Sequence, residues 1–208
     1  MYKVEEVAAL RSFLAVELSR EIEEGIRRIQ EKLKRRVEGV RWLRPEGIHL
    51  TLKFLGEIDP DRIEEIVDKA QQAVKGIGPF EIRIKGGGGF PNTKNPRVIW
   101  LGVEDQGGLL RELQARVEKG LEELGFKREE RDYTPHLTLG RLRTGRGKGG
   151  VAQAIKDMGD SDLGAMKIRE IVLFQSQLKP SGAEYTKLRT IPLEDRGNPP
   201  ARDQRDRG

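Results

Sequence analysis

One tetrapeptide occurs twice in this chain, as His49-Leu50-Thr51-Leu52 and as His136-Leu137-Thr138-Leu139. The 208 residues include two histidines, and each of them opens one copy of the tetrapeptide. Leucine and threonine suit a half-buried strand, in which successive side chains point to opposite faces. Each copy is therefore predicted to present an imidazole and a hydroxyl side by side, with its leucines anchored in a core. Two such strands could converge on one small substrate.

Strand and helix patterns alternate along the rest of the chain. Ser19 is the predicted N-cap of a helix that runs to about residue 36, and Asp59 with Pro60 is predicted to open a helix that runs to about 74. Apolar spacing predicts two more helices, over 109–124 and 151–158. Strands are predicted over 11–18, 40–44, 48–55, 80–84, 97–101, from 136 onward, 167–178 and 185–193. In the first of these, alternation places Phe13, Ala15 and Glu17 on one face and Leu14, Val16 and Leu18 on the other.

Three segments have compositions that favour turns or disorder. Gly86 to Gly89 lack the Lys-Ser/Thr of a phosphate-binding loop, so we expect them to end the strand 80–84 in a tight bend or bulge. A loop rich in arginine and glycine runs from 141 to 150. The charged, proline-containing stretch 194–208 is predicted to be a disordered tail, which leaves residues 1–193 as one domain.

The two histidines lie 87 residues apart, and each tetrapeptide follows a strand-helix region and precedes a helix. This internal echo predicts an α+β protein of two pseudo-symmetric lobes, with antiparallel sheets and helices outside them, whose tetrapeptide strands face each other.

Composition excludes several classes of site and location. The absence of cysteine removes disulfides, thiolate metal sites and thiol nucleophiles. No apolar run reaches the roughly 18 residues that span a bilayer, and the N-terminus lacks the features of a signal peptide, so no membrane association and a cytoplasmic location are expected. A net charge of +5 is a mild bias toward polyanions such as RNA.

The paired imidazoles suggest acid–base chemistry on a phosphodiester. One neutral imidazole can deprotonate water while a protonated one supplies a proton to the leaving oxygen. Thr51 and Thr138 could hold the non-bridging oxygens, and Arg141, five residues after His136, could neutralise developing charge. Phe54 occupies the matching position after His49. Odd spacing places Arg141 and Phe54 on the opposite strand face unless the strand bulges.

Two other interpretations of these residues compete with catalysis. A single strand histidine is more often structural, but a packing account gives no reason to repeat the same tetrapeptide at both histidines. A two-histidine metal site lacks a cysteine or a convincing carboxylate partner, so no metal is expected. The cationic run of Arg141, Arg143, Arg146 and Lys148 is either a solvated loop or a surface for RNA phosphates.

With these motifs in view, the chain resembles the 2H phosphoesterase superfamily, and closely its RNA 2′,3′-cyclic phosphodiesterase branch, historically called 2′-5′ RNA ligases. The doubled H-x-T-x signature carries the resemblance, together with its flanks. Those flanks read RSFLAVEL, W-x-x-P-E-G-I before the first copy and K-FLGE after it, GGGGFPN with PRVIWLGV, Y-T-P before the second copy, and S-x-L-x-P-x-G-x-x-Y from Ser176 to Tyr185. The resemblance runs from about Arg11 to Leu193.

This resemblance implies a bilobal α+β fold with the active site in a cleft between two antiparallel sheets. It implies hydrolysis of an RNA 2′,3′-cyclic phosphate end to a 2′-phosphomonoester, without metal or other cofactor, by a protein that needs no obligate partner and is expected to be a monomer. The implied roles are general acid for His49, general base for His136, phosphate contacts for Thr51, Thr138 and Arg141, and packing on the nucleobase for Phe54.

Two alternatives remain open from the sequence. A 2′-5′ RNA ligase would use the same histidines to join a 2′,3′-cyclic end to a 5′-hydroxyl. A non-catalytic module would use the histidines and Arg141 to bind an RNA end, although binding alone does not require two titrating groups.

Overall fold

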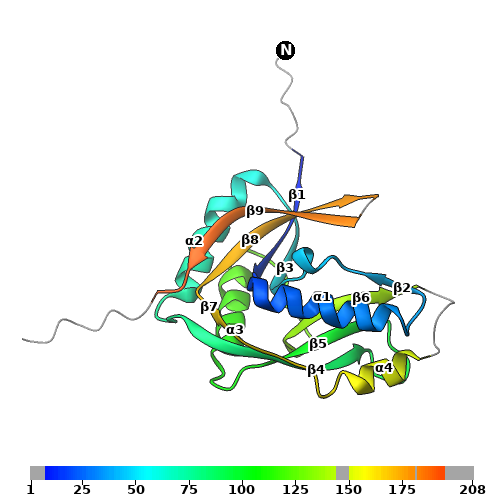
Figure 1. Ribbon diagram of the computed structural model, residues 1–208. Coiled ribbons are helices and arrows are strands. Elements are labelled where there is room, and N and C mark those ends of the chain that lie inside the picture. Colours follow the sequence, from blue (N-terminus) through cyan, green and yellow to red (C-terminus); the bar gives the residue numbers. More distant parts are fainter. Residues whose placement is uncertain (1–7, 144–149, 181, 195–208) are drawn as a thin grey trace, which may run out of the picture.

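A computed structural model describes residues 8–143, 150–180 and 182–194 of the chain (Figure 1). The strands are β1 (Leu10–Val16), β2 (Val40–Trp42), β3 (Leu50–Ile58), β4 (Phe80–Phe90), β5 (Val98–Glu104), β6 (His136–Leu142), β7 (Asp162–Ile168), β8 (Glu170–Lys179) and β9 (Gly182–Pro192). The α-helices are α1 (Arg20–Lys34), α2 (Ile63–Val74), α3 (Leu109–Glu122) and α4 (Val151–Asp157). Two short 3-10 helices, η1 (Pro45–Gly47) and η2 (Pro60–Arg62), complete the described elements.

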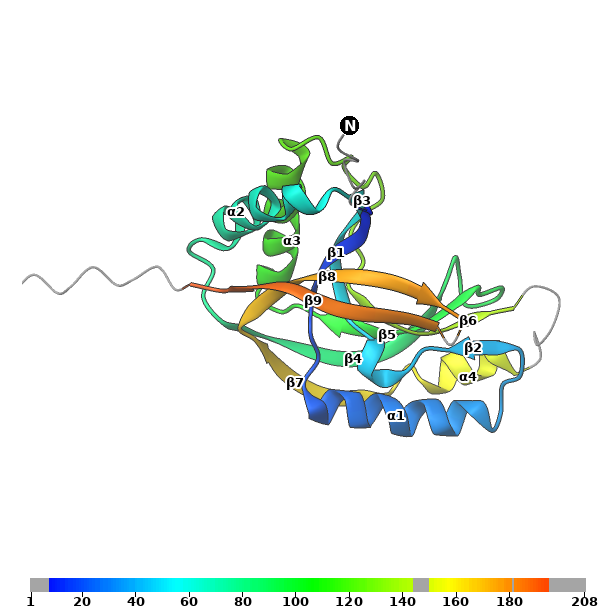
Figure 2. The ribbon, with the colours of Figure 1, turned by 90° about the horizontal axis from the view of Figure 1, so that it is seen from above.

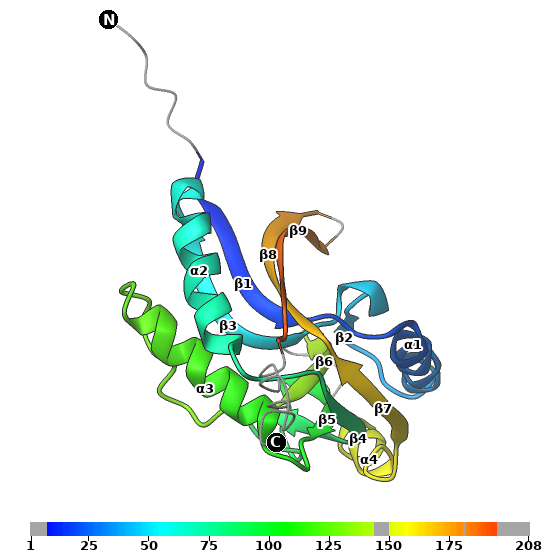
Figure 3. The same ribbon diagram turned by 90° about the vertical axis from the view of Figure 1, so that its left-hand side faces the viewer.

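The strands form two antiparallel sheets, with α1 and α4 on one side of the molecule and α2 and α3 at one end (Figures 2 and 3). One sheet has the order β3-β1-β8-β9, and the other has the order β2-β6-β5-β4-β7. The predicted α+β class with two lobes is confirmed. The lobes are interlocked, because β2 from the first half joins the second sheet while β8 and β9, at the end of the chain, complete the first sheet.

Four elements recur in the same order in the two halves of the chain. β1, α1, β3 and α2 begin at residues 10, 20, 50 and 63, and β5, α3, β6 and α4 begin at 98, 109, 136 and 151. Each offset is close to the 87 residues between the two histidines. The two halves of the chain therefore repeat one strand-helix-strand-helix unit, with a tetrapeptide in each second strand.

Most predicted strands are within a few residues of the observed ones, and the largest differences are in β4 and in the segment 162–179. β4 continues through the tetraglycine to Phe90 instead of ending before it, although the expected bulge is present as a register shift between Ile84 and Gly87. The single strand predicted over 167–178 is wrong. The chain breaks at Arg169, because β7 pairs with β4 in one sheet while β8 pairs with β1 in the other.

The tetraglycine pairs with β5, and neighbouring side chains pack closely against its backbone. A Cβ on Gly88 would lie 2.2 Å from the ring of Trp100, and one on Gly87 would lie 2.7 Å from the Cβ of Met158. Any larger side chain would displace these groups. The glycines therefore create the space that Trp100 occupies.

The predicted helix starts are close to the observed ones. The Ser19 hydroxyl accepts a hydrogen bond from the Ile22 amide and caps α1. Asp59 caps the 3-10 turn η2, and α2 itself begins at Ile63. None of the described helices is long and apolar enough to cross a membrane.

Of the predicted tail, 194–208, the structure describes only the first residue, Glu194. Glu194 forms an isolated bridge with Lys75, so ordered chain extends one residue into the stretch assigned to the tail. Residues 195–208 lie outside the described part, as do residues 144–149 of the arginine- and glycine-rich loop with Arg146 and Lys148. The division into a domain over 1–193 and a disordered tail stays a prediction.

The core covers one face of each sheet and continues under the helices. On β1, Leu14 and Val16 join this main cluster, whereas Phe13 and Ala15 point to the opposite face and form a second, smaller cluster with Val172 and Phe174 of β8. The alternation predicted for residues 11–18 is confirmed. The face that carries the smaller cluster is aromatic, and this face carries the first histidine.

A buried ion pair joins the first tetrapeptide strand to a helix of the second half. Lys53 of β3 and Glu118 of α3 are 2.6 Å apart between Nζ and Oε2, with side chains that are 2% and 7% exposed. The Lys53 ammonium also donates to the Lys127 carbonyl at 2.9 Å. Buried charges are costly unless paired, so each partner depends on the other.

We predict that Lys53→Met lowers the free energy of unfolding by about 3 to 5 kcal/mol, because it leaves the Glu118 carboxylate buried without a counter-charge. The double variant Lys53→Met, Glu118→Leu should recover most of this loss, and urea unfolding measures both. Lys85→Met, which removes an exposed ion pair with Glu104, is the matched control and should cost less than about 1 kcal/mol. A double variant as unstable as the single one would contradict the prediction.

Candidate active site

The first tetrapeptide lies on the aromatic face of the four-stranded sheet. His49 directly precedes β3, and its imidazole centroid is 4.5 Å from the ring of Phe174, 5.1 Å from Tyr185 and 5.8 Å from Phe13. Thr51 is opposite Ala15, so its hydroxyl lies on the same face as these rings. The predicted side-by-side arrangement of imidazole and hydroxyl is present in this strand.

The second tetrapeptide has an equivalent setting in the five-stranded sheet. His136 opens β6, and its ring is 4.9 Å from Phe90 and 6.2 Å from Trp100. Thr138 is the cross-strand partner of Trp100 and shares its face. The indole Nε1 of Trp100 is buried without a hydrogen-bond partner among the described residues, which leaves a donor beside this motif.

Each tetrapeptide strand bulges at the same motif position. In β3, Leu52 is an extra residue between Thr51, opposite Ala15, and Lys53, opposite Leu14. In β6, the extra residue is Leu139, at the corresponding motif position. A bulge inserts one residue and re-aims the side chains beyond it.

The bulges return Phe54 and Arg141 to the motif faces despite their odd spacing. Phe54 lies opposite Phe13, with ring centroids 6.0 Å apart, and it is 70% exposed. Arg141 lies beyond the bulge of β6 and close enough to His136 to influence its pKa. The sequence predicted that these two residues share the face of the histidines only if their strands bulge, and both strands do bulge.

Helices from the opposite halves fix these bulges. The amide of Gln30, in α1, donates to the Leu139 carbonyl at 2.9 Å and to the Leu43 carbonyl at 2.9 Å. The amide of Gln114, in α3, donates to the Leu52 carbonyl at 3.5 Å. The Leu139 carbonyl also accepts from the Leu43 amide at 3.0 Å, so Gln30 adds a second hydrogen bond at this bulge. The buried glutamines thus provide side-chain donors to the carbonyl of each extra residue.

The two motif strands are also linked to each other. β3 and β6 are in contact, and the Tyr133 hydroxyl, three residues before His136, donates to the Thr51 carbonyl at 3.1 Å. Arg111 of α3 in turn donates to the Tyr133 carbonyl. The segment that leads into the second motif is thereby fixed against the first motif.

Burial lowers the pKa of both imidazoles from the ordinary 6.5. At His49 the Glu17 carboxylate and the Gly47 backbone oppose this effect, and Lys187 adds to it. At His136 the Thr134 backbone opposes the lowering of the pKa, and the Arg141 guanidinium adds to it. The two sites differ because a carboxylate, Glu17, opposes the lowering of the pKa at His49, whereas the charged side chain that acts on His136, Arg141, adds to the lowering.

The tautomer of His136 follows from its backbone contact. Its Nδ1 is 2.7 Å from the Thr134 carbonyl oxygen, so the neutral ring carries its proton on Nδ1. The lone pair of the neutral ring is therefore on Nε2, the nitrogen available for proton transfer. Among the described residues, no three His, Asp or Glu side chains gather as a metal site requires.

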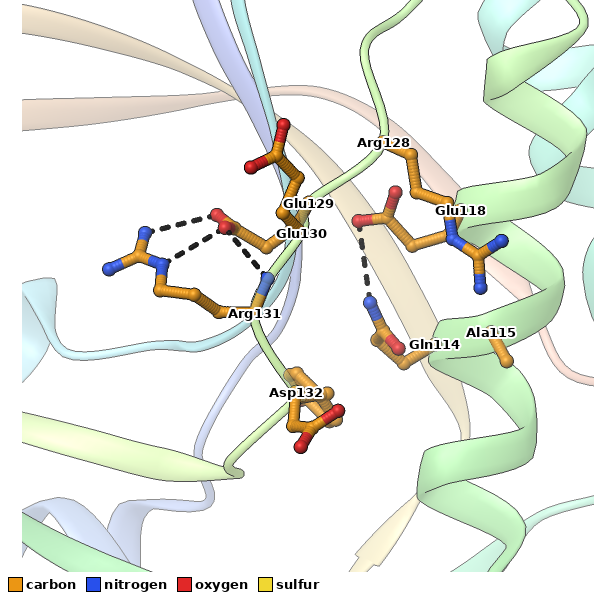
Figure 4. A pocket seen from close by; sticks show the side chains of 9 residues that line it. Gln114, Ala115, Glu118, Arg128, Glu129, Glu130, Arg131 and Asp132 are labelled. Atoms are coloured by element: carbon orange, nitrogen blue, oxygen red, sulfur yellow. Dashed lines mark hydrogen bonds and ion pairs between the residues drawn. The ribbon is translucent and has the colours of Figure 1, made fainter.

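A cavity of about 400 Å³ lies elsewhere in the molecule (Figure 4). Its lining comes from α3 and from the segment after it, including Gln114, Glu118 and residues 128–133. Neither histidine lines it, and its charged side chains have both signs. This cavity borders the buried support of β3 and does not include the motif residues.

The doubled motif agrees with comparisons to known proteins. The family profile described as LigT like Phosphoesterase matches twice, over residues 16–100 and 101–185, with one tetrapeptide in each match. The chain belongs to the LigT-like phosphoesterase family.

Relatives match most of the length of this LigT-like protein. A curated relative from Methanothermobacter thermautotrophicus, named RNA 2′,3′-cyclic phosphodiesterase, is 37% identical over 88% of this chain and 99% of its own. One of the same name from Archaeoglobus fulgidus is 37% identical over 88% and 99%. The crystal structure of TT0787 of Thermus thermophilus has a TM-score of 0.74 and 28% identity over 90% of this chain and all of that one.

The structure also adds site residues of this LigT-like protein that the sequence analysis did not identify. Phe13, Phe174 and Tyr185 surround His49, and Phe90 and Trp100 flank His136. The alternation of residues 11–18 had already separated Phe13 from the main core face. The other rings come from strands far away in sequence, and no local pattern assigns them to a histidine.

We predict that both histidines of this LigT-like protein titrate below pH 6.5, because burial favours the neutral rings. Ring-proton NMR gives two imidazole signals in this chain, and His49→Gln and His136→Gln assign them. A midpoint at or above pH 7 for either signal would contradict the prediction.

The same pKa shifts predict how stability depends on pH. The folded state favours neutral imidazoles, so their contribution is fully present above the unfolded pKa of about 6.5 and is lost as the pH falls through the lower folded values. The unfolding free energy of the wild type should therefore fall as the solution is acidified from pH 6.5. The double variant His49→Gln, His136→Gln should lack this component, and chemical denaturation at several pH values measures the difference.

Proposed function

We propose that this protein hydrolyses the 2′,3′-cyclic phosphate end of RNA to a 2′-phosphomonoester. The observation that carries the proposal is the pair of imidazole–hydroxyl units, each on a bulged strand and one of them beside an arginine. The curated relatives named RNA 2′,3′-cyclic phosphodiesterase, which this chain matches over most of their length, support the choice of substrate.

In the proposed reaction, water attacks phosphorus, and the bond from phosphorus to the 3′ oxygen breaks. His136 removes a proton from the water as general base, and His49 gives a proton to the 3′ oxygen as general acid. Thr51 and Thr138 hydrogen-bond the non-bridging oxygens, and Arg141 neutralises their developing charge. The products are a 2′-phosphate and a free 3′-hydroxyl.

The surroundings of the two rings support this division of roles. Arg141 disfavours a proton on His136, whereas the Glu17 carboxylate favours one on His49. The hydrogen bond from His136 Nδ1 to the Thr134 carbonyl leaves Nε2 as the basic nitrogen. Arg141 thus favours the neutral form of His136, which a general base needs, and Glu17 favours the protonated form of His49, which a general acid needs.

Phe54 provides a further contact for the substrate. Its ring lies beside Phe13 and is 70% exposed. Exposing this apolar ring to water is unfavourable, and a nucleobase that stacks on the ring would offset the cost. We also propose that the enzyme needs no metal or other cofactor, because its own side chains supply both proton transfers. We propose in addition that it works as a monomer in the cytoplasm.

The direct test is product analysis of an RNA oligonucleotide with a 2′,3′-cyclic phosphate end, incubated with the protein in EDTA. We expect a 2′-phosphate product with wild type and a loss of at least about 100-fold with His49→Ala or His136→Ala, as for removal of a general acid or base. An unchanged cyclic end would overturn the proposal, and a 5′-hydroxyl strand in a parallel reaction would then reveal ligation.

A second measurement is the pH dependence of kcat/KM. One group must be protonated and the other neutral, so the profile should be bell-shaped. Because burial lowers both pKa values in the free enzyme, the maximum should lie below pH 6.5. A flat profile between about pH 5 and 8, or a maximum above pH 7.5, would contradict the two-histidine mechanism.

A further inference from the structure

Arg41 of β2 shares the motif face of the five-stranded sheet with Arg141. The two residues are direct cross-strand partners in the β2–β6 ladder, so their side chains leave the sheet on the same side. Their neighbours Val40 and Trp42 point the other way, toward Gly140 and the main core. Both arginines are exposed.

This juxtaposition has an electrostatic cost. Like charges directly opposite each other in an antiparallel ladder repel. Within the described parts of the chain, neither Arg41 nor Arg141 takes part in an ion pair with a carboxylate. Two guanidinium groups that leave one face of the same ladder are suited to an anionic ligand with more than one charge.

Arg41 also extends toward the other sheet. A Cβ on Gly182, at the tip of the β8–β9 hairpin, would lie 3.9 Å from an Arg41 guanidinium nitrogen. The hairpin face that begins at Phe174, beside His49, continues through Ser176 to Leu178, which is 72% exposed. Exposed apolar surface and an arginine thus lie together at the hairpin, outward from His49.

We propose that Arg41 binds the internucleotide phosphate on the 5′ side of the cyclic end, so that the substrate is an oligonucleotide and not a mononucleotide. This inference rests on the proposed function, in which Arg141 contacts the reacting phosphate. Arg41 then contacts the next phosphate along the same strand, and the preceding nucleotide lies against the hairpin near Leu178.

The chemistry of the two residues supports this assignment. Guanidinium groups present paired donors that match phosphate oxygens. Cross-strand Cα atoms are about 4.5 to 5.5 Å apart, so two long side chains can each reach a different phosphate of one strand. A mononucleotide would engage Arg141 and leave Arg41 without a phosphate.

The test compares three substrates in the full-length protein. The first is cytidine 2′,3′-cyclic phosphate, the second a ribodinucleotide with the same cyclic end, and the third that dinucleotide with a neutral methylphosphonate linkage. The variants are Arg41→Gln and, as a matched control, Arg28→Gln, which removes an exposed arginine of α1. The measured quantity is the ratio of kcat/KM for the natural and the neutral dinucleotide.

We expect a ratio of about 10 or more for wild type and Arg28→Gln, as for loss of one charged hydrogen-bond contact, and a ratio near 1 for Arg41→Gln. The slope of log kcat/KM against log salt for the natural dinucleotide should become less steep by about 0.7 in Arg41→Gln. A wild-type ratio near 1, or a ratio that Arg41→Gln leaves high, would overturn the proposal.

Failure of the underlying function gives a different result. If wild type hydrolyses none of the three substrates, the proposed hydrolysis is wrong. The affinities of wild type and Arg41→Gln for the natural and neutral dinucleotides, measured by calorimetry, then test the contact between Arg41 and the phosphate independently of hydrolysis. Equal affinities of wild type for the two dinucleotides would reject it.

Discussion

The site depends on two β-bulges, each at the final leucine of one tetrapeptide. Without them, strand alternation would direct Phe54 and Arg141 to the face opposite the histidines. The carbonyl of each extra residue accepts a hydrogen bond from a glutamine of the other half of the chain, Gln30 for Leu139 and Gln114 for Leu52. The geometry of the proposed site is therefore supported by contacts between the repeats as well as by the β1–β3 and β5–β6 ladders within them.

Interlocked repeats explain why the molecule has one main core despite its two sheets. β2 leaves the first half to extend the second sheet, and the final hairpin returns to complete the first sheet. The two sets of motif residues are consequently fixed relative to each other through shared helices and the Tyr133 contact. The proposed reaction, in which two imidazoles transfer protons to one substrate, needs such a fixed arrangement.

The repeats differ where chemistry requires it. The residue after the bulge is Lys53 in the first strand, where it forms a buried ion pair, and Gly140 in the second, where any Cβ would contact Val40. The next residue is Phe54 in one strand and Arg141 in the other. An aromatic ring on one side and a cation on the other distinguish the base-binding side of the proposed site from its phosphate-binding side.

Local patterns alone determined much of this protein. Side-chain alternation and short-range hydrogen bonding account for the strand character of the doubled tetrapeptide, the α1 cap at Ser19 and the two faces of residues 11–18. Tertiary structure decided the rest, because it depends on contacts between residues far apart in sequence. Pairing between distant strands, which no local pattern records, produces the break at Arg169 and brings the aromatic rings around each histidine. The same pairing creates the bulges that re-aim Phe54 and Arg141 and places Arg41 beside Arg141.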